Sequence, residues 1–117
     1  MTRRPWRLSA AARADIRRVL AETIRQFGRF QAQRYRAALL RTLERAGEAP
    51  LLPASRDLGW RNLRSLHVGV VAGRAASGAH VVIYRVPADV GDPVVIVRVL
   101  HERMDPARHL GGAGQDD

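Results

Sequence analysis

The chain has 117 residues, 46% of them hydrophobic and 26% charged, a composition that fits one folded domain and excludes an intrinsically disordered chain. Cysteine is absent, which excludes disulfides, a thiol nucleophile and cysteine-ligated zinc, and no apolar run approaches the ~20 residues of a membrane-spanning helix. The 20 basic residues are all arginine and outnumber 11 acidic ones, so the net charge of +9 attracts acidic proteins and nucleic acids alike.

The first residues predict a short strand and then a helix. Residues 5–8 (PWRL) are a candidate strand, and Ser9 after them is a suitable helix N-cap. Apolar residues then recur mostly at spacings of three and four, the period of an amphipathic helix, as far as Phe27. Gly28 ends this helix, because glycine is the residue that most readily adopts the left-handed conformation common after a helix.

A second helix is predicted from Phe30 to Ala49, where Pro50 stops it. Its apolar residues keep the same period: Tyr35, Leu39, Leu43 and Ala46. Because the connection at Gly28 and Arg29 is very short, we expect an antiparallel helical hairpin. The apolar stripe of each helix then needs another layer to cover it.

The second half of the chain changes to a period of two, which is typical of strands. Three segments rich in valine and isoleucine are predicted as strands, over residues 63–71, 80–86 and 94–100. Turn-forming residues link them at 73–78 and 87–93, so the three strands form an antiparallel meander. The order strand, helix, helix, strand, strand, strand predicts an α+β fold in which a two-helix hairpin packs on a small antiparallel sheet.

Alternation in the last strand assigns its side chains to two faces. The face that we expect to meet the helices is all valine: Val95, Val97 and Val99. Arg98 belongs to the opposite face, and Arg85 of the preceding strand is placed there by the same reasoning. Both arginines are therefore predicted on the open face of the sheet, although a shift of one residue in phase reverses the assignment.

Motifs spread over residues 5–110 occur in an informative order. Along the chain they are Leu8-Ser9, Asp15-Ile16, the junction from Gly28 to Tyr35, HVVIYR at 80–85 and VIVRVLHERMD at 95–105. Each motif is degenerate by itself. In this order and spacing, however, the chain resembles the RelE/ParE superfamily of type II toxins, and its ParE branch most closely.

The resemblance implies one toxin-like domain at residues 5–110, between short tails at 1–4 and 111–117. It also implies a cytoplasmic toxin without a cofactor, held inactive by a cognate acidic antitoxin of the ribbon-helix-helix type. ParE-type toxins inhibit DNA gyrase by binding to it. Gyrase is therefore the expected target, nucleic acid is contacted only indirectly, and no membrane is involved.

Two sets of residues are candidates for these contacts. The target-binding candidates are side chains of the last two strands and the C-terminal segment: Arg85, Arg98, His101, Arg103 and Arg108. Arg98, Arg103 and Arg108 equally fit a solvated surface with local ion pairs worth ~0–1 kcal/mol each. The antitoxin-binding candidates are apolar residues of the first helix, an expected floor for a segment that folds on binding: Val19, Leu20 and Ile24.

Two other functions stay open on the sequence. RelE-type relatives cut mRNA on the ribosome, and here Arg74, Arg98 and His101 would stabilise charge and move protons. This set is partial, because Glu102 stands where a tyrosine often follows the strand-end histidine. The other function is a plain arginine-rich nucleic-acid-binding domain. His101 also fits a purely structural role, and the four histidines lack the spacing of metal ligands, so no metal site is expected.

Overall fold

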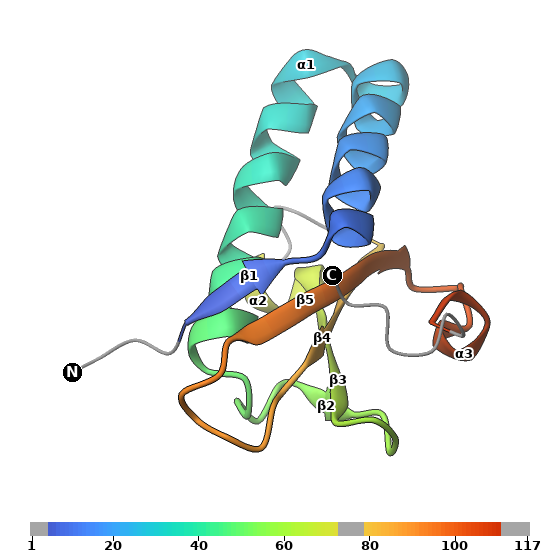
Figure 1. Cartoon of the computed structure of the whole chain (residues 1–117). Helices are drawn as coiled ribbons and strands as arrows, with labels where there is room; N and C mark the ends of the chain where they lie inside the picture. The colour runs from blue at the N-terminus through green and yellow to red at the C-terminus, as the bar shows by residue number, and fades with distance from the viewer. Residues whose placement is uncertain (1–4, 73–78, 111–117) are drawn as a thin grey trace.

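The computed structural model describes residues 5–72 and 79–110, which form an α+β fold with a helical layer on a five-stranded sheet (Figure 1). The predicted α+β class is therefore confirmed. The elements in chain order are β1 (Trp6–Leu8), α1 (Ala10–Glu48), β2 (Arg56–Asp57), β3 (Leu63–His67), α2 (Val68–Ala72), β4 (His80–Arg85), β5 (Val94–His101) and α3 (Pro106–His109). The predicted turn at 73–78, with Arg74, and both predicted tails lie outside the described residues.

The strands follow the order β1-β5-β4-β3-β2 across the sheet. The predicted strands β3, β4 and β5 pair with one another in antiparallel fashion, as expected for a meander. β1 instead runs parallel to β5, with Trp6 opposite Val94 and Leu8 opposite Ile96. The sheet is thus mixed, and the expectation of a wholly antiparallel sheet is wrong at this edge. The reason is that the chain leaves β1, passes through α1 and brings its last strand back beside the first in the same direction.

α1 begins and bends at the predicted residues. The Ser9 hydroxyl accepts a hydrogen bond from the Ala12 N–H (3.0 Å) and thereby caps the helix. α1 is assigned as one helix of 39 residues, but Gly28 inside it has φ 88° and ψ 170°, a conformation that favours glycine. Figure 1 shows the two arms of α1 lying side by side. Within the described part of the chain, no helix is both long and apolar enough to cross a bilayer.

The predicted strand over 63–71 is too long, because α2 begins at Val68. The His67 side chain accepts a hydrogen bond from the Gly69 N–H (2.9 Å) and so satisfies a free donor at the start of this short helix. Val68 is fully buried in the core. Residues 68–71 have the composition of a strand, but they form a helical turn in which a free N–H at the start is satisfied by the His67 side chain.

α3 and β2 are absent from the sequence-based prediction. Asp105 caps α3 by accepting from the Ala107 N–H (3.1 Å), and Pro106 takes the first helical position. This Asp-Pro pair is a usable helix-start signal. β2 has only two residues, both exposed, and pairs with β3 without an apolar pattern that could reveal it.

A β-bulge in β5 shifts the predicted faces of the sheet. Tyr84 pairs with Ile96 and Ile83 with Arg98, so Val97 is left over in the ladder. The residues of β4 and β5 that pack in the core with α1 are Val82, Tyr84, Val94, Ile96 and Val99. The other apolar residues of β4 and β5 belong to a second apolar cluster, separate from the core with α1: Val81, Ile83, Val95, Val97 and Leu100. The all-valine prediction is thus right for the last of its three valines and wrong for the first two, because alternation moves by one residue at the bulge.

Candidate functional site

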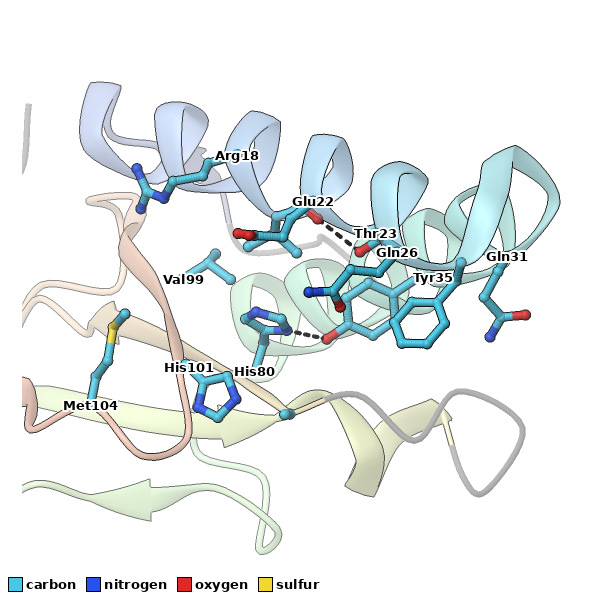
Figure 2. A pocket seen from close by; sticks show the side chains of 13 residues that line it. Arg18, Glu22, Thr23, Gln26, Gln31, Tyr35, His80, Val99, His101 and Met104 are labelled. Atoms are coloured by element: carbon cyan, nitrogen blue, oxygen red, sulfur yellow. Dashed lines mark hydrogen bonds between the residues drawn. The ribbon is translucent and has the colours of Figure 1, made fainter.

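A cavity of about 610 Å³ opens between α1 and the end of the sheet where β4 begins and β5 ends (Figure 2). Both arms of α1 contribute side chains to it, and so does the turn after β5. Its lining includes Val19, Phe27, Tyr35, His80, His101 and Met104. Apolar and hydrogen-bonding side chains are mixed, so the cavity suits a peptide segment that carries both kinds of group.

Three histidines lie on three adjacent strands at this end of the sheet. His67 ends β3, His80 begins β4, and His80 is paired across the ladder with His101, the last residue of β5. The rings of His80 and His101 meet edge to face, with centroids 5.7 Å apart. His80 Nδ1 also shares a hydrogen bond of 2.7 Å with the Tyr35 hydroxyl of α1. His67 Nε2 lies 2.6 Å from a carboxylate oxygen of Glu102, so α1 and the turn after β5 are both joined to the cluster.

The surroundings of His80 favour its neutral ring. Burial lowers the pKa of His80, and the charges of the other two histidines lower it further, while Glu102 and Glu22 act in the opposite direction. Burial also raises the pKa of Tyr35 to about 12, so its hydroxyl stays protonated at neutral pH. Tyr35 and His80 therefore form an uncharged hydrogen-bonded pair beside the cavity.

The lowered pKa of His80 predicts a loss of stability in weak acid. Below about pH 6.5, the pKa of an unfolded histidine, the unfolded chain binds this proton more readily than the folded protein does. The free energy of unfolding should therefore fall as the pH falls through this range. Urea unfolding at about pH 7.5 and about pH 5.5 measures the change.

Two variants identify the group responsible for this pH dependence. His80→Gln should reduce the difference in unfolding free energy between the two pH values. His109→Gln changes an exposed histidine outside the cavity lining and should keep the wild-type difference. Equal pH dependence in His80→Gln and the wild type would show that His80 is not the titrating group.

The predicted antitoxin-binding residues divide between core and cavity. Val19 is 8% exposed and lines the cavity, whereas Leu20 is half-buried against the core. Ile24 is 45% exposed and lies outside the cavity lining. The prediction missed Phe27, which is 67% exposed at the cavity although it belongs to the same apolar series. It also missed Met104, a lone apolar residue between charged neighbours that carries no periodic signal.

Strand alternation predicts Arg98 on the open face of the sheet, but its guanidinium is engaged in hydrogen bonds with other parts of the chain. Its Nε (2.7 Å) and Nη2 (3.0 Å) donate to the Asp15 carboxylate of α1, and Nη1 donates to the His109 carbonyl oxygen (3.0 Å). Asp15 is 1% exposed and also accepts the Val99 N–H (2.9 Å). Arg98 adjoins the bulge, where the alternation shifts, and its side chain connects α1 to β5.

The other target-binding candidates do not converge on one site. His101 lines the cavity, and Arg103 and Arg108 are exposed on the segment after β5. Arg85 is half-buried and paired across the ladder with Val95, on the side of the second apolar cluster. His101 Nδ1 accepts the Arg103 N–H (3.1 Å), so this histidine has the structural contact with the turn that the sequence left open.

Among the described residues, the candidates for mRNA cleavage do not lie together in one site. Arg98 is bound to Asp15 and lies outside the cavity lining, whereas His101 is within it. Arg74 is not among the described residues. In the ranges that the structure describes, no three histidine, aspartate or glutamate residues are grouped to hold a metal ion.

Comparison with known proteins identifies the family. Residues 6–106 match the family described as the ParE toxin of type II toxin-antitoxin system, parDE. The chain belongs to this family. It is 37% identical over 108 residues to the toxin ParE1 of Caulobacter vibrioides, which covers 92% of this chain and 99% of that protein.

Two further relatives of the ParE family support this assignment. The chain is 33% identical over 100 residues to the toxin ParE of Escherichia coli, with 84% of each chain covered. It is 31% identical over 106 residues to the toxin ParE1 of Mycobacterium tuberculosis, with 88% and 94% covered. The resemblance inferred from the motifs is confirmed, and membership in a type II toxin-antitoxin family implies a cognate antitoxin as partner.

Proposed function

We propose that the protein is a cytoplasmic toxin that inhibits DNA gyrase by binding to it. An acidic ribbon-helix-helix antitoxin neutralises it by placing a C-terminal segment in the cavity between α1 and the sheet. The toxin performs no catalysis and uses no cofactor. Nucleic acid is reached only through gyrase, and no membrane takes part.

The exposed apolar rim of the cavity is the observation that carries the antitoxin part of the proposal. Phe27 of α1 is 67% exposed and Met104 after β5 is 42% exposed, and both line the cavity together with Val19. A segment that covers these side chains removes apolar surface from water, a gain of roughly 25 cal/mol per Å². Arg18 lines the cavity and pairs with Asp15, but its side chain is 58% exposed, so it can also attract an acidic segment and speed its association.

The gyrase part is supported by the family and by exposed charge. Of the predicted target contacts, Arg103 and Arg108 are the arginines whose side chains stand out from the surface after β5. Arg98 is engaged with Asp15 and Arg85 is half-buried, so we assign them no primary target contact. His101 supports the turn that presents Arg103.

A gyrase assay tests this proposal with antitoxin-free toxin, supercoiled plasmid and ATP. We expect linear DNA after detergent and protease treatment, and we expect it to disappear when the cognate antitoxin is added. The double variant Arg103→Ala/Arg108→Ala should need a roughly tenfold higher concentration for the same cleavage. Arg34→Ala/Arg36→Ala removes the same charge from an exposed part of α1 and should act like the wild type.

Each outcome of this assay has a defined meaning. Unchanged plasmid with toxin that is folded by circular dichroism overturns gyrase as the target. Equal loss of activity in both double variants shows that net charge, and not the segment after β5, supports gyrase binding. Cleavage that persists with a bound antitoxin overturns the neutralisation mechanism.

A further inference from the structure

The hairpin tip, defined as residues 59–62 between β2 and β3, has an unusual backbone. Leu63 N–H donates to the Trp60 carbonyl oxygen (3.1 Å), and the two residues between them, Arg61 and Asn62, have φ of 54° and 57°. Two consecutive positive φ values are those of a type I′ hairpin turn, which favours asparagine, aspartate and glycine. Asn62 fits this preference, but Arg61 does not, because its Cβ crowds the backbone in the left-handed region. Strained residues of this kind are concentrated at functional sites.

The Trp60 ring holds the Arg61 side chain in place. The guanidinium carbon of Arg61 lies 5.1 Å from the centroid of this ring, in cation–π contact. Trp60 in turn packs with Leu58 against the second apolar cluster, which includes Ile83. The ring is therefore fixed by the sheet, and it orients an arginine that is itself exposed.

A hollow of about 450 Å³ lies beside the hairpin tip. Its lining includes Trp60, Arg61, Arg64, Asp57, Val86 and Leu51. Leu51 is 68% exposed, so the hollow presents an uncovered apolar side chain next to an oriented cation. Tryptophan and arginine beside such a hollow are typical of the few residues that dominate the affinity of a protein interface.

The hairpin tip and the cavity lie at opposite ends of β4. His80 at the start of this strand lines the cavity, and Val86 just after its end lines the hollow. In Figure 1 the β2–β3 hairpin extends at the bottom, away from the arms of α1 at the top. A segment bound in the cavity therefore leaves the hairpin tip accessible.

We propose that the hairpin tip is a contact surface for the toxin's target protein, with Arg61 binding carboxylates of an acidic patch. This inference rests on the proposed function and adds to the target contacts after β5. Guanidinium and carboxylate groups match in a bidentate geometry, and an arginine held in advance loses little side-chain entropy on binding. The hairpin tip adds to affinity for the target, whereas neutralisation depends on the cavity.

The chemistry of the hairpin tip favours a protein over a nucleic acid. Trp60 packs on the apolar cluster and its ring is in contact with Arg61, so it does not offer an open platform on which a base could stack. The Asp57 carboxylate in the hollow lies 3.8 Å from Arg64 and offsets its charge, so the lining carries less net positive charge than contacts with a phosphate backbone usually need.

The variant Arg61→Gly tests the inference because strain and binding predict opposite effects. Glycine accepts the positive φ, so the melting temperature should be unchanged or higher, while the toxin should need a roughly tenfold higher concentration to cleave plasmid through gyrase. Asn62→Gly relaxes the neighbouring backbone but keeps the guanidinium, so it should retain wild-type cleavage. Arg36→Ala removes one exposed charge from α1 and should also act like the wild type.

Binding of the antitoxin and growth arrest on induction separate the possible failures. Arg61→Gly should bind the antitoxin like the wild type and arrest growth less. Full cleavage and full growth arrest by Arg61→Gly, with an active wild type, overturn the inference and leave the proposed function intact. An inactive wild type in both assays overturns the proposed function and this inference with it. If the toxin binds plasmid in the absence of gyrase, and Arg61→Gly weakens this binding, then the partner of the hairpin tip is nucleic acid. That result would also overturn the inference.

Discussion

Asp15→Ala is expected to reduce the free energy of unfolding by about 3–5 kcal/mol, because it leaves a largely buried guanidinium without its counter-ion. The Asp15 carboxylate accepts hydrogen bonds from Arg98 Nε (2.7 Å), Arg98 Nη2 (3.0 Å) and the Val99 N–H (2.9 Å). Its side chain is 2% exposed and that of Arg98 is 22% exposed, so water replaces these contacts poorly. For a chain of this size, such a loss lowers the melting temperature by more than roughly 10 °C.

The pKa of Asp15 also shows that its contacts with Arg98 and Val99 outweigh the cost of burying its charge. Burial alone raises the pKa of this carboxyl, but the hydrogen bonds from Arg98 and Val99 and the charge of Arg98 outweigh burial and lower it. The charged form is therefore favoured in the folded protein. Its contribution is present above the ordinary pKa of an aspartate and is lost as the pH falls through the lowered value.

Arg18→Ala is the matched control for Asp15→Ala. Arg18 binds the same carboxylate (2.5 Å), but its side chain is 58% exposed, so we expect a loss of only ~0–1 kcal/mol. Asp15→Asn keeps the size of the side chain and can still accept the Val99 N–H, and we expect an intermediate loss. Urea unfolding of the three variants measures the order. An Asp15→Ala loss no larger than that of Arg18→Ala would show that the buried pair does not stabilise the fold.

Much of the fold follows from short-range rules. Ser9 and Gly28 are the start and the break of α1 because a capping hydroxyl and a positive φ depend on single residues. β4 and β5 follow from period-two valine and isoleucine. The reversal of faces in β5 could not be predicted, because a bulge depends on how two strands pair and leaves no mark in either strand alone.

The site was less predictable because its contacts join distant parts of the chain. Val19 could be found from helical period, and it does line the cavity. The Tyr35–His80 hydrogen bond spans 45 residues, and no local pattern relates its two members. Arg98 shows the same limit, since its carboxylate partner is 83 residues away on another element. Side chains that look alike in sequence therefore divide into structural and exposed ones only when the sheet and helix are assembled.

Gly47→Ala is expected to destabilise the protein by about 2–3 kcal/mol, although alanine is the better helix former. Gly47 lies near the end of α1, and a Cβ there would be 2.6 Å from both Cδ1 and Cδ2 of Trp6 in β1. The nearest atom is Trp6 Cγ, which stays in place when the ring turns about χ2, so the whole Trp6 side chain or the backbone of α1 must move. The change can be measured by urea unfolding, with Ala37→Gly on an exposed part of α1 giving the size of the propensity effect alone.

A double-mutant cycle with Trp6→Ala distinguishes this clash from other causes. If Gly47 is required only so that the Trp6 ring can approach α1, then Gly47→Ala should cost little or should stabilise once the ring is gone. The expected coupling energy is about 2 kcal/mol, as for residues in direct contact. Additive losses in the cycle would mean that Gly47 is needed for the helix itself. The close approach of Gly47 to Trp6 brings the parallel edge strand β1 against the last turns of α1, and this packing explains why a glycine is placed where helix propensity alone would favour alanine.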